Sequence, residues 1–502
     1  MKHQKEFETL KEIFKKITDL RGIRRLLSWD QETYMPKTGQ ENRAAQVSLI
    51  SSLIHELLTS EETGRLINAI CEEVDIENSE DDLSVCIKHW KREYDRATKI
   101  PNTLVKELAY KSALAHETWI KAKKSKDFSI FLPDLSSLVK LSIEKAKCLG
   151  FEDHPYDALL DEFEPEVKTK EIEGLFKELV PETQQLIETL LTKQKANKAT
   201  SLKGPFPIKK QKHLATIMAN AIGYDLESGR IDTVVHPFST KIGPGDCRIT
   251  TRWNEKDFTE AIFSILHEAG HGIYSQNLPA EHYGTPLGES VSLGIHESQS
   301  RLWENFIGRS RAFWIYFLPI AKGFFPVELK KIALEEFLQA INKVTPSFIR
   351  VEADEVTYNL HIFLRFEIEK DLIAGNLLPQ DIPDAWNSLF EKLFGLKVPD
   401  DSLGCLQDVH WSGASFGYFP TYTLGNIYAA MLFKSAQKEI IDLPILIELG
   451  LFKELFLWLK EKIYTQGKRY NSSRLIQKIT GQEPQSKYLI DYLKEKYENL
   501  YY

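Results

Sequence analysis

The stretch Ala261-Ile262-Phe263-Ser264-Ile265-Leu266-His267-Glu268-Ala269-Gly270-His271 joins an apolar run to an H-E-x-x-H pentapeptide. The apolar run predicts a helix that is buried on most of its sides. Because residues four apart lie on one face of a helix, His267 and His271 can direct their imidazoles at one point. Two histidines at this spacing suit a tetrahedral Zn²⁺ ion. The stretch therefore predicts a metal-binding helix in the core of the fold.

Glu268 lies one position further round the same helix. That position is poor for a third metal ligand but favourable for a general base beside a metal-bound water, whose pKa a metal lowers towards about 7. The alternative interpretation is a chance match on a core helix. We prefer the metal site, because a buried helix with two histidines and a glutamate needs a partner for each of them.

The composition is that of a globular protein, with 42% hydrophobic and 27% charged residues and a net charge of −8. Without a basic arm, the chain is not expected to bind nucleic acid. The segment 1–19 is amphipathic and has no apolar core of a signal peptide, and no run of about 18 apolar residues predicts a membrane span. Five scattered cysteines without a C-x-x-C pair indicate a reducing cytoplasm.

Apolar residues recur with a helical period through most of the chain, so we predict a mainly α-helical fold. The clearest predicted helices are 7–20, 104–124, 135–149, 172–193 and 329–343. We find no internal repeat and no low-complexity linker, and we therefore treat residues 1–502 as a single domain.

The segment 233–253 interrupts the helical pattern. Val234-Val235 and the run 247–251 are rich in β-forming residues, and Gly243-Pro244-Gly245 separates them. We predict a small antiparallel sheet just before the metal helix. Its edge could pair with an extended peptide, or the hairpin could only cap the helix, and the sequence does not separate these alternatives.

A catalytic zinc ion keeps three protein ligands and one open position. No third histidine follows closely after His271, so a glutamate on a downstream helix is the expected third ligand. The candidates are Glu281, Glu289, Glu297 and Glu304. Spacing alone leaves Glu289 and Glu297 in competition, although Glu297 stands in a helical stretch, 293–303, with room for a loop and a return helix before it.

A series of further motifs follows one order along the chain. They are Leu27-Ser28-Trp29-Asp30, Pro155-Tyr156-Asp157-Ala158-Leu159-Leu160-Asp161, His236-Pro237-Phe238, Asp246-x-Arg248-x-Thr250, His267-Glu268-x-x-His271, His296-Glu297-Ser298, Ile349-Arg350-x-x-Ala353-Asp354, Gly404-x-x-Gln407-Asp408-x-His410-Trp411 and Ser415-Phe416-Gly417-Tyr418-Phe419-Pro420-Thr421-Tyr422. Together they resemble the carboxypeptidase Taq family of zinc metallocarboxypeptidases over most of the chain.

The resemblance implies a mainly helical fold with a long groove, a homodimer, and the removal of single residues from peptide C-termini. It implies His267, His271 and Glu297 as the metal ligands and Glu268 as the general base and acid. Cys247 and Met431 depart from the family pattern, and neither is one of these ligands.

A carboxypeptidase must bind a free α-carboxylate near the scissile bond, and arginine does this best through paired charge-assisted hydrogen bonds. Arg350, in an apolar context, is the predicted carboxylate ligand, and Arg248 is predicted to close the blind end of the groove. Each could instead form a structural ion pair, Arg350 with Asp354 for example.

The tetrahedral oxyanion needs a hydrogen-bond donor besides the metal. His410, Tyr418 and Tyr422 are candidates, and His410 ranks first because Gln407 and Asp408 could orient it. Each tyrosine could equally be a packing residue. His236 follows a predicted strand, and its role as a substrate-binding, supporting or structural residue stays open.

The sequence thus predicts a cytoplasmic zinc metallocarboxypeptidase that acts on peptides with a free C-terminus. One Zn²⁺ is expected per chain, and Co²⁺ or another divalent metal could substitute for it. One alternative is a zinc endopeptidase or oligopeptidase that uses the same metal helix. The other is a peptide-binding scaffold without turnover, which the presence of Glu268 disfavours.

Overall fold

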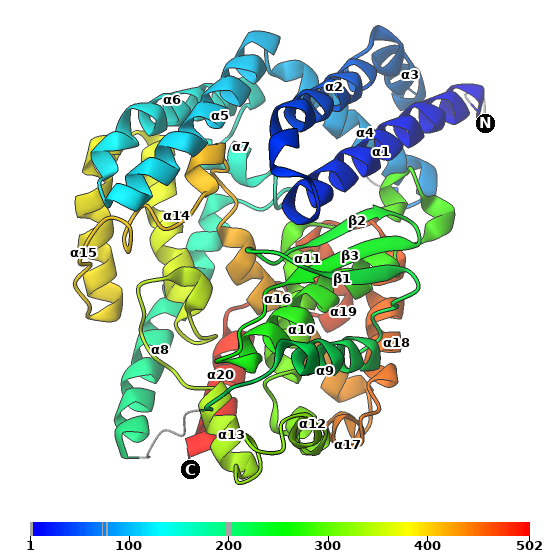
Figure 1. The fold of residues 1–502 in the computed structure, drawn as a ribbon. Helices are drawn as coiled ribbons and strands as arrows, with labels where there is room; N and C mark the ends of the chain where they lie inside the picture. Colours follow the sequence, from blue (N-terminus) through cyan, green and yellow to red (C-terminus); the bar gives the residue numbers. More distant parts are fainter. Residues whose placement is uncertain (1–3, 73, 77–78, 197–201, 502) are drawn as a thin grey trace. The chain divides into compact units, whose positions relative to one another are not determined.

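The computed structural model describes residues 4–72, 74–76, 79–196 and 202–501, which fall into two compact units (Figure 1). The first unit comprises Met1–Thr98, Thr200–Ile341 and Leu432–Gly481. The second comprises Lys99–Ala199, Asn342–Met431 and Gln482–Tyr502. The prediction of one domain over residues 1–502 stays a prediction.

The first unit holds a small sheet and a set of helices drawn from three parts of the chain. Its strands are β1 (Gly229–Thr233), β2 (Ser239–Gly243) and β3 (Asp246–Thr251). Its helices are α1 (Gln4–Thr33), α2 (Gln40–Leu58), α3 (Glu61–Cys71), α4 (Asp82–Lys99, all but its last residue), α9 (Ile208–Ala221), α10 (Phe258–Gln276), α11 (Leu293–Arg301), α12 (Arg311–Phe324), α13 (Leu334–Ile341), α17 (Leu443–Glu448), α18 (Lys453–Lys462) and α19 (Ser472–Thr480).

Helices α1 to α4 bury one shared apolar cluster. Leu10, Phe14 and Ile17 recur along one face of α1 and pack against apolar residues of the other three helices. The ring of Phe14 stacks on Trp90 of α4 with the centroids 4.7 Å apart. This cluster fixes α1, whose later turns carry Trp29.

The sheet is mixed, which corrects the prediction of an antiparallel sheet. Its strand order is β1-β3-β2, with β2 antiparallel and β1 parallel to β3. The short turn between β2 and β3 enforces the antiparallel pair. The prediction missed β1 because Gly229–Thr233 carries charged residues, and it assigned Val234-Val235, which follow the strand, in its place.

In Figure 1 the sheet lies between α1 on one side and α10 on the other. The alternation along β3 follows this arrangement, because neighbouring side chains of a strand point to opposite faces. Cys247 and Ile249 are buried, and Ile249 lies against Gly272 of α10. Arg248, between them, places its guanidinium 4.1 Å from the centre of the Trp29 ring of α1.

Among its described residues, the second unit consists of helices and loops without a strand. Its helices are α5 (Asn102–Ser125), α6 (Leu132–Leu149), α7 (Pro155–Leu160), α8 (Thr169–Ala196), α14 (Tyr358–Ala374), α15 (Ile382–Phe394), α20 (Lys487–Tyr501) and the first part of α16 (Pro420–Glu439). Helix α14 is buried along most of its length, and its Phe366 packs against Tyr156 and Phe176. Helix α14 thus forms part of the buried core of the second unit.

The predicted helices are confirmed as parts of α1, α5, α6 and α8, while the predicted helix 329–343 is shorter than expected. Helix α13 begins only at Leu334, where the Glu336 carboxylate accepts the Ala333 N–H at 3.0 Å and so caps the first turn. Among the described residues, no helix combines the length and apolar character that crossing a bilayer requires.

Candidate metal centre

The predicted metal helix is α10, and its local sequence defines its start. Asp257 caps it, with its side chain accepting the Thr259 N–H at 2.9 Å. Most of its residues are buried, as the apolar run predicted. His267 and His271 lie one turn apart, with ring centroids 5.0 Å apart, and both are only partly buried.

Helix α11 lies unusually close to α10, and Gly270 explains how. A Cβ atom at Gly270 would lie 2.5 Å from the Gln299 carbonyl oxygen and 2.7 Å from the Ser300 Cα atom. Only glycine admits the α11 backbone at this distance. The Ser292 side chain starts α11 by accepting the Ile295 N–H. The close approach brings Glu297 under the two histidines.

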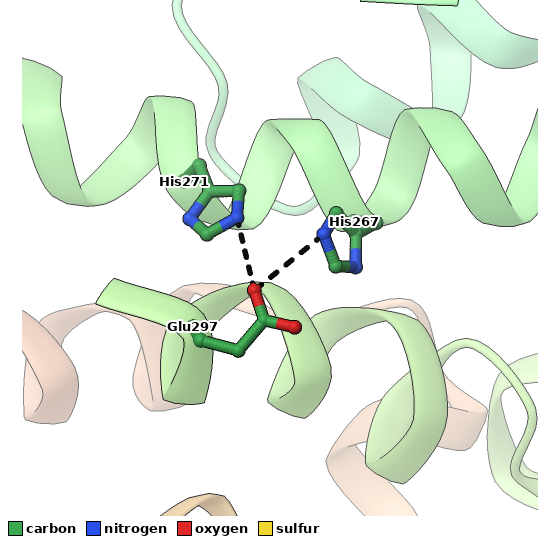
Figure 2. Close-up of side chains that lie close together, drawn as sticks. All are labelled: His267, His271 and Glu297. Atoms are coloured by element: carbon green, nitrogen blue, oxygen red, sulfur yellow. Dashed lines mark ion pairs between the residues drawn. The ribbon is translucent and has the colours of Figure 1, made fainter. Parts of the chain in front are cut away.

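Figure 2 shows the resulting cluster, in which the two imidazoles of α10 face one carboxylate oxygen of α11. Glu297 Oε2 lies 3.3 Å from His271 Nε2 and 3.7 Å from His267 Nε2. One donor atom from each of the three residues lies within 4.8 Å of the others.

This donor set fits a divalent metal. Donors about 2.0–2.2 Å from a tetrahedral ion lie roughly 3.3–3.6 Å apart, which is close to the two observed separations between nitrogen and oxygen. Two imidazole nitrogens and one carboxylate oxygen are also the donors that zinc and similar metals take in catalytic sites. The residues therefore fit the predicted ion in number, type and spacing.

Both carboxylate oxygens of Glu297 also accept hydrogen bonds from side chains of α11. Arg301 Nε donates to Oε1 at 2.7 Å, and Ser300 Oγ donates to Oε2 at 3.0 Å. Burial alone would raise the pKa of Glu297, but Arg301 and His267 bring that pKa well below its usual range. The carboxylate is thus ionised and its direction fixed, as a metal ligand requires.

Glu304, one of the spacing candidates for the third ligand, has a different place. Its Oε2 lies 2.9 Å from His267 Nδ1, on the side of the ring away from Glu297. Arg301 and Arg309 pair with the same carboxylate. Burial opposes ionisation, yet His267 and Arg301 lower the pKa of Glu304 to about 2. Glu304 therefore orients His267 from behind, a role that the sequence prediction missed.

Glu268 lies in the middle of α10 and is 6% exposed. Burial raises the pKa of its carboxyl, and the nearby imidazoles of His267 and His271 oppose the rise. A raised pKa makes the carboxylate a stronger proton acceptor. Its position on the ligand helix is compatible with the predicted general base.

The other two candidate ligands lie elsewhere. Glu281 is exposed in a short 3₁₀ turn, Ala280–His282. Glu289 forms an ion pair with Lys468. Burial would raise the pKa of Glu289, but Lys468 and Arg21 lower it to about 2. Glu297 is thus the candidate that the described structure brings to the two histidines.

Arg248 stands on β3 and combines two contacts. Its Nε and Nη2 atoms donate to the Asp246 carboxylate at 2.8 and 2.7 Å. Its guanidinium stacks on the ring of the buried Trp29, and the Arg230 guanidinium lies 5.1 Å from the centre of the same ring. These contacts hold the partly exposed Arg248 side chain, and its predicted role at the end of the groove stays a prediction.

Arg350 is 5% exposed and lies in the second unit. Its Nε and Nη2 atoms donate to Asp408 Oδ1 at 3.0 and 2.8 Å, and Nη1 donates to the Tyr358 hydroxyl at 2.9 Å. Asp408 also accepts from the fully buried Arg365 at 2.6 Å. The ion-pair partner of Arg350 is thus Asp408, whereas Asp354 accepts backbone N–H groups of its own turn.

His410 begins a 3₁₀ turn, His410–Gly413, within an aromatic cluster of the second unit. Its ring lies 5.2 Å from Tyr418, and its Nε2 lies 3.4 Å from the Tyr422 hydroxyl. Gln407 and Asp408, which were predicted to orient it, bind the Arg350 backbone and the two arginines instead.

Glu369 holds this cluster in place and was missed by the sequence prediction. It accepts hydrogen bonds from the Tyr156 hydroxyl at 2.7 Å, Trp411 Nε1 at 2.8 Å and the Gly417 N–H at 3.0 Å. The predicted oxyanion roles of His410, Tyr418 and Tyr422 stay predictions. His236 lies exposed in the bend after β1, and its role also stays open.

Comparisons with known proteins agree along the whole chain. The sequence profile of the carboxypeptidase Taq (M32) metallopeptidase family matches residues 9–497. Thermostable carboxypeptidase 1 of Thermus thermophilus is 41% identical over 504 residues, and carboxypeptidase 1 of Bacillus subtilis is 40% identical over 499 residues, with 99% of each chain covered in both cases.

Among solved structures, that of the M32 carboxypeptidase from Deinococcus radiodurans R1 has a TM-score of 0.95 at 35% identity and covers 99% of this chain and 100% of its own. The family match, the identity with these relatives and the three-donor cluster support one conclusion. The chain belongs to the carboxypeptidase Taq (M32) family of metallopeptidases, and it is a metallocarboxypeptidase.

Proposed function

We propose that one Zn²⁺ per chain, bound by His267, His271 and Glu297, serves the removal of single residues from peptide C-termini. The observation that carries the proposal is the convergence of His267 Nε2 and His271 Nε2 on Glu297 Oε2. Co²⁺ or another divalent metal with similar ligand preferences could replace Zn²⁺ at this donor set.

The metal, when bound, supplies a Lewis acid that polarises the scissile carbonyl and lowers the pKa of a water molecule. Glu268 takes the proton of the water that attacks the last peptide carbonyl. It then passes this proton to the nitrogen of the departing amino acid. Glu304 and Arg301 keep His267 and Glu297 in fixed orientations while the proton moves. His410, Tyr418 and Tyr422 remain the proposed donors to the oxyanion.

Arg248 and Arg350 are the proposed ligands of the substrate carboxylate. The contacts of Arg350 to Asp408 and Tyr358 reduce the donors that it can offer. The Arg248 side chain is 16% exposed and belongs to the same unit as the metal cluster. We therefore rank Arg248 first for this role, with Arg350 as the alternative.

The proposed activity is tested with a peptide whose N-terminus is blocked. Purified protein should release free amino acids one at a time from the C-terminus, and the mass of the remaining peptide should fall by one residue at each step. A chelator should stop the release, and added Zn²⁺ should restore it. Internal fragments would support a zinc endopeptidase, and intact peptide after metal loading would support a scaffold without turnover.

Amidation of the peptide C-terminus should reduce kcat/KM by roughly 10- to 150-fold. The reason is the loss of a hydrogen bond to a charged group, which contributes about 1.5–3 kcal/mol. Arg248→Ala should reduce turnover of the free acid by a similar factor and have little further effect on the amide. The same cycle with Arg350→Ala shows whether that residue is the ligand instead. An amide cleaved as fast as the acid would contradict carboxylate recognition.

We also propose that the protein forms a homodimer and that it is located in the cytoplasm. The resemblance to the family supports the dimer. The free thiols of Cys71, Cys86, Cys148, Cys247 and Cys405 support a reducing compartment.

A further inference from the structure

The two histidines of the metal centre are supported from behind in different ways. His267 Nδ1 faces the Glu304 carboxylate at 2.9 Å. His271 Nδ1 faces the Nδ1 atom of another histidine, His296, at 2.6 Å. The His296 side chain is partly buried, and its other nitrogen, Nε2, lies 3.2 Å from the Ser275 hydroxyl.

Only one arrangement of protons satisfies the hydrogen bonds from His271 to His296 and from His296 to Ser275 when His271 binds a metal. A neutral imidazole carries one proton, and a ligand nitrogen must offer its lone pair. Because Nε2 of His271 faces Glu297, its proton is on Nδ1 and points at His296. Nδ1 of His296 must then accept, so that its own proton is on Nε2 and points at Ser275.

The packing around His296 fixes its ring in the orientation that these hydrogen bonds require. The ring lies 4.7 Å from that of His271 and 5.1 Å from that of Tyr274. The Ser275 hydroxyl also hydrogen-bonds with the thiol of Cys247, which is buried under the sheet. The hydrogen bonds thus run from the proposed metal ligand His271 to His296 of α11, and then through Ser275 of α10 to β3.

The use of a neutral acceptor has an electrostatic reason. Glu268, Glu297 and Glu304 already place three carboxyl groups beside the two ligand histidines. A fourth carboxylate behind His271 would add a negative charge at a buried position where repulsion is strong. An imidazole can accept the same hydrogen bond without that charge.

We propose that His296 is a positioning residue, which accepts the Nδ1–H of His271 and thereby presents His271 Nε2 for metal binding. This inference rests on the proposed metal centre and extends it to a residue that does not contact the metal. Ser275 supports the inference by providing the acceptor for the other proton of His296.

Metal affinity tests the inference without reference to peptide cleavage. The dissociation constant of Zn²⁺ is measured by competition with a chromophoric chelator at one pH. His296→Leu removes the acceptor and should weaken Zn²⁺ binding by about 10- to 100-fold, as loss of such a partner commonly does. In His296→Asn, the side-chain oxygen takes the place of Nδ1, and most of the affinity should return.

Nitrogen NMR of the Zn²⁺-loaded protein provides the second readout. With labelled histidine, His271 should carry its proton on Nδ1 in the wild type and in His296→Asn, and this hydrogen-bonded proton signal should be lost in His296→Leu. Tyr274→Phe is the control, because Tyr274 contacts the same ring but its hydroxyl accepts the Val291 N–H instead. This variant should lower Tm and leave Zn²⁺ affinity unchanged.

A folded His296→Leu variant that binds Zn²⁺ as tightly as the wild type would overturn the inference alone. Protonation of His271 on Nε2 in the loaded protein would also overturn it. Failure of the wild type to bind Zn²⁺ at all would overturn the proposed metal centre together with this inference. The two failures are therefore distinguishable.

Discussion

Glu268→Gln is expected to keep the metal and to lose turnover by about 10²- to 10⁴-fold. Glutamine has the same shape as glutamate but cannot take a proton from the attacking water. The fold should tolerate the change, because burial already disfavours the ionised form of this carboxyl and raises its pKa. The measurement is kcat/KM on a blocked peptide, combined with the metal content of the same sample.

Glu260→Gln is the matched control for this variant. Glu260 lies in the first turn of the same helix, where it pairs with Arg252 at the surface. Its substitution should leave turnover near the wild-type value. A Glu268→Gln variant with activity close to that of Glu260→Gln would remove Glu268 from the mechanism.

Asp408→Asn is expected to destabilise the protein by about 3–5 kcal/mol, since removing one partner leaves buried charges uncompensated. The Asp408 carboxylate forms ion pairs with two buried guanidinium groups, Arg350 Nη2 at 2.8 Å and Arg365 Nη2 at 2.6 Å. Burial would raise the pKa of Asp408, but these guanidinium groups bring it well below its usual range. The measurement is the shift in Tm and in the urea midpoint at neutral pH.

Asp491→Asn is the control for the effect of losing a carboxylate. Asp491 pairs with Lys487 on the exposed face of α20, and such fully exposed pairs contribute little to stability. Equal losses of stability in the two variants would contradict the structural role of the Asp408 triad. In that case Arg350 would be the stronger candidate for the substrate carboxylate.

The part of the fold that the sequence predicts well is the part that depends on local periodicity. The apolar run before His267 predicts a buried helix, and i, i+4 spacing predicts that both histidines share a face. The structure confirms both expectations in α10. Spacing also placed Glu297 on a return helix, α11, although it could not separate Glu297 from Glu289 without the family resemblance.

The partners behind the ligands depend on packing between helices, which no local pattern reveals. His296 contacts His271 only because Gly270 allows α11 to approach α10 closely. Glu304 left a weak signal, since it follows Glu297 by two helical turns and so lies on the same side. The sequence analysis counts Glu304 only among the candidate ligands, because nothing in the local pattern marks it as a partner of His267.

Two other differences between the sequence analysis and the structure have the same origin. Arg350 lies in an apolar stretch, which indicates burial but not the partner 58 positions away. The sheet was predicted antiparallel because a hairpin is visible in the sequence, whereas β1 pairs with β3 through a parallel register that no turn signal marks. Non-local pairing, in each case, decided the outcome.

Titration of metal-free protein with Zn²⁺ tests the central claim most directly. The account predicts that bound metal and peptidase activity rise together and level off at one Zn²⁺ per chain. Glu297→Ala should bind far less metal and gain little activity over the same range. Full activity in the metal-free protein, or unchanged metal binding in Glu297→Ala, would contradict the assignment of His267, His271 and Glu297 as the catalytic metal site.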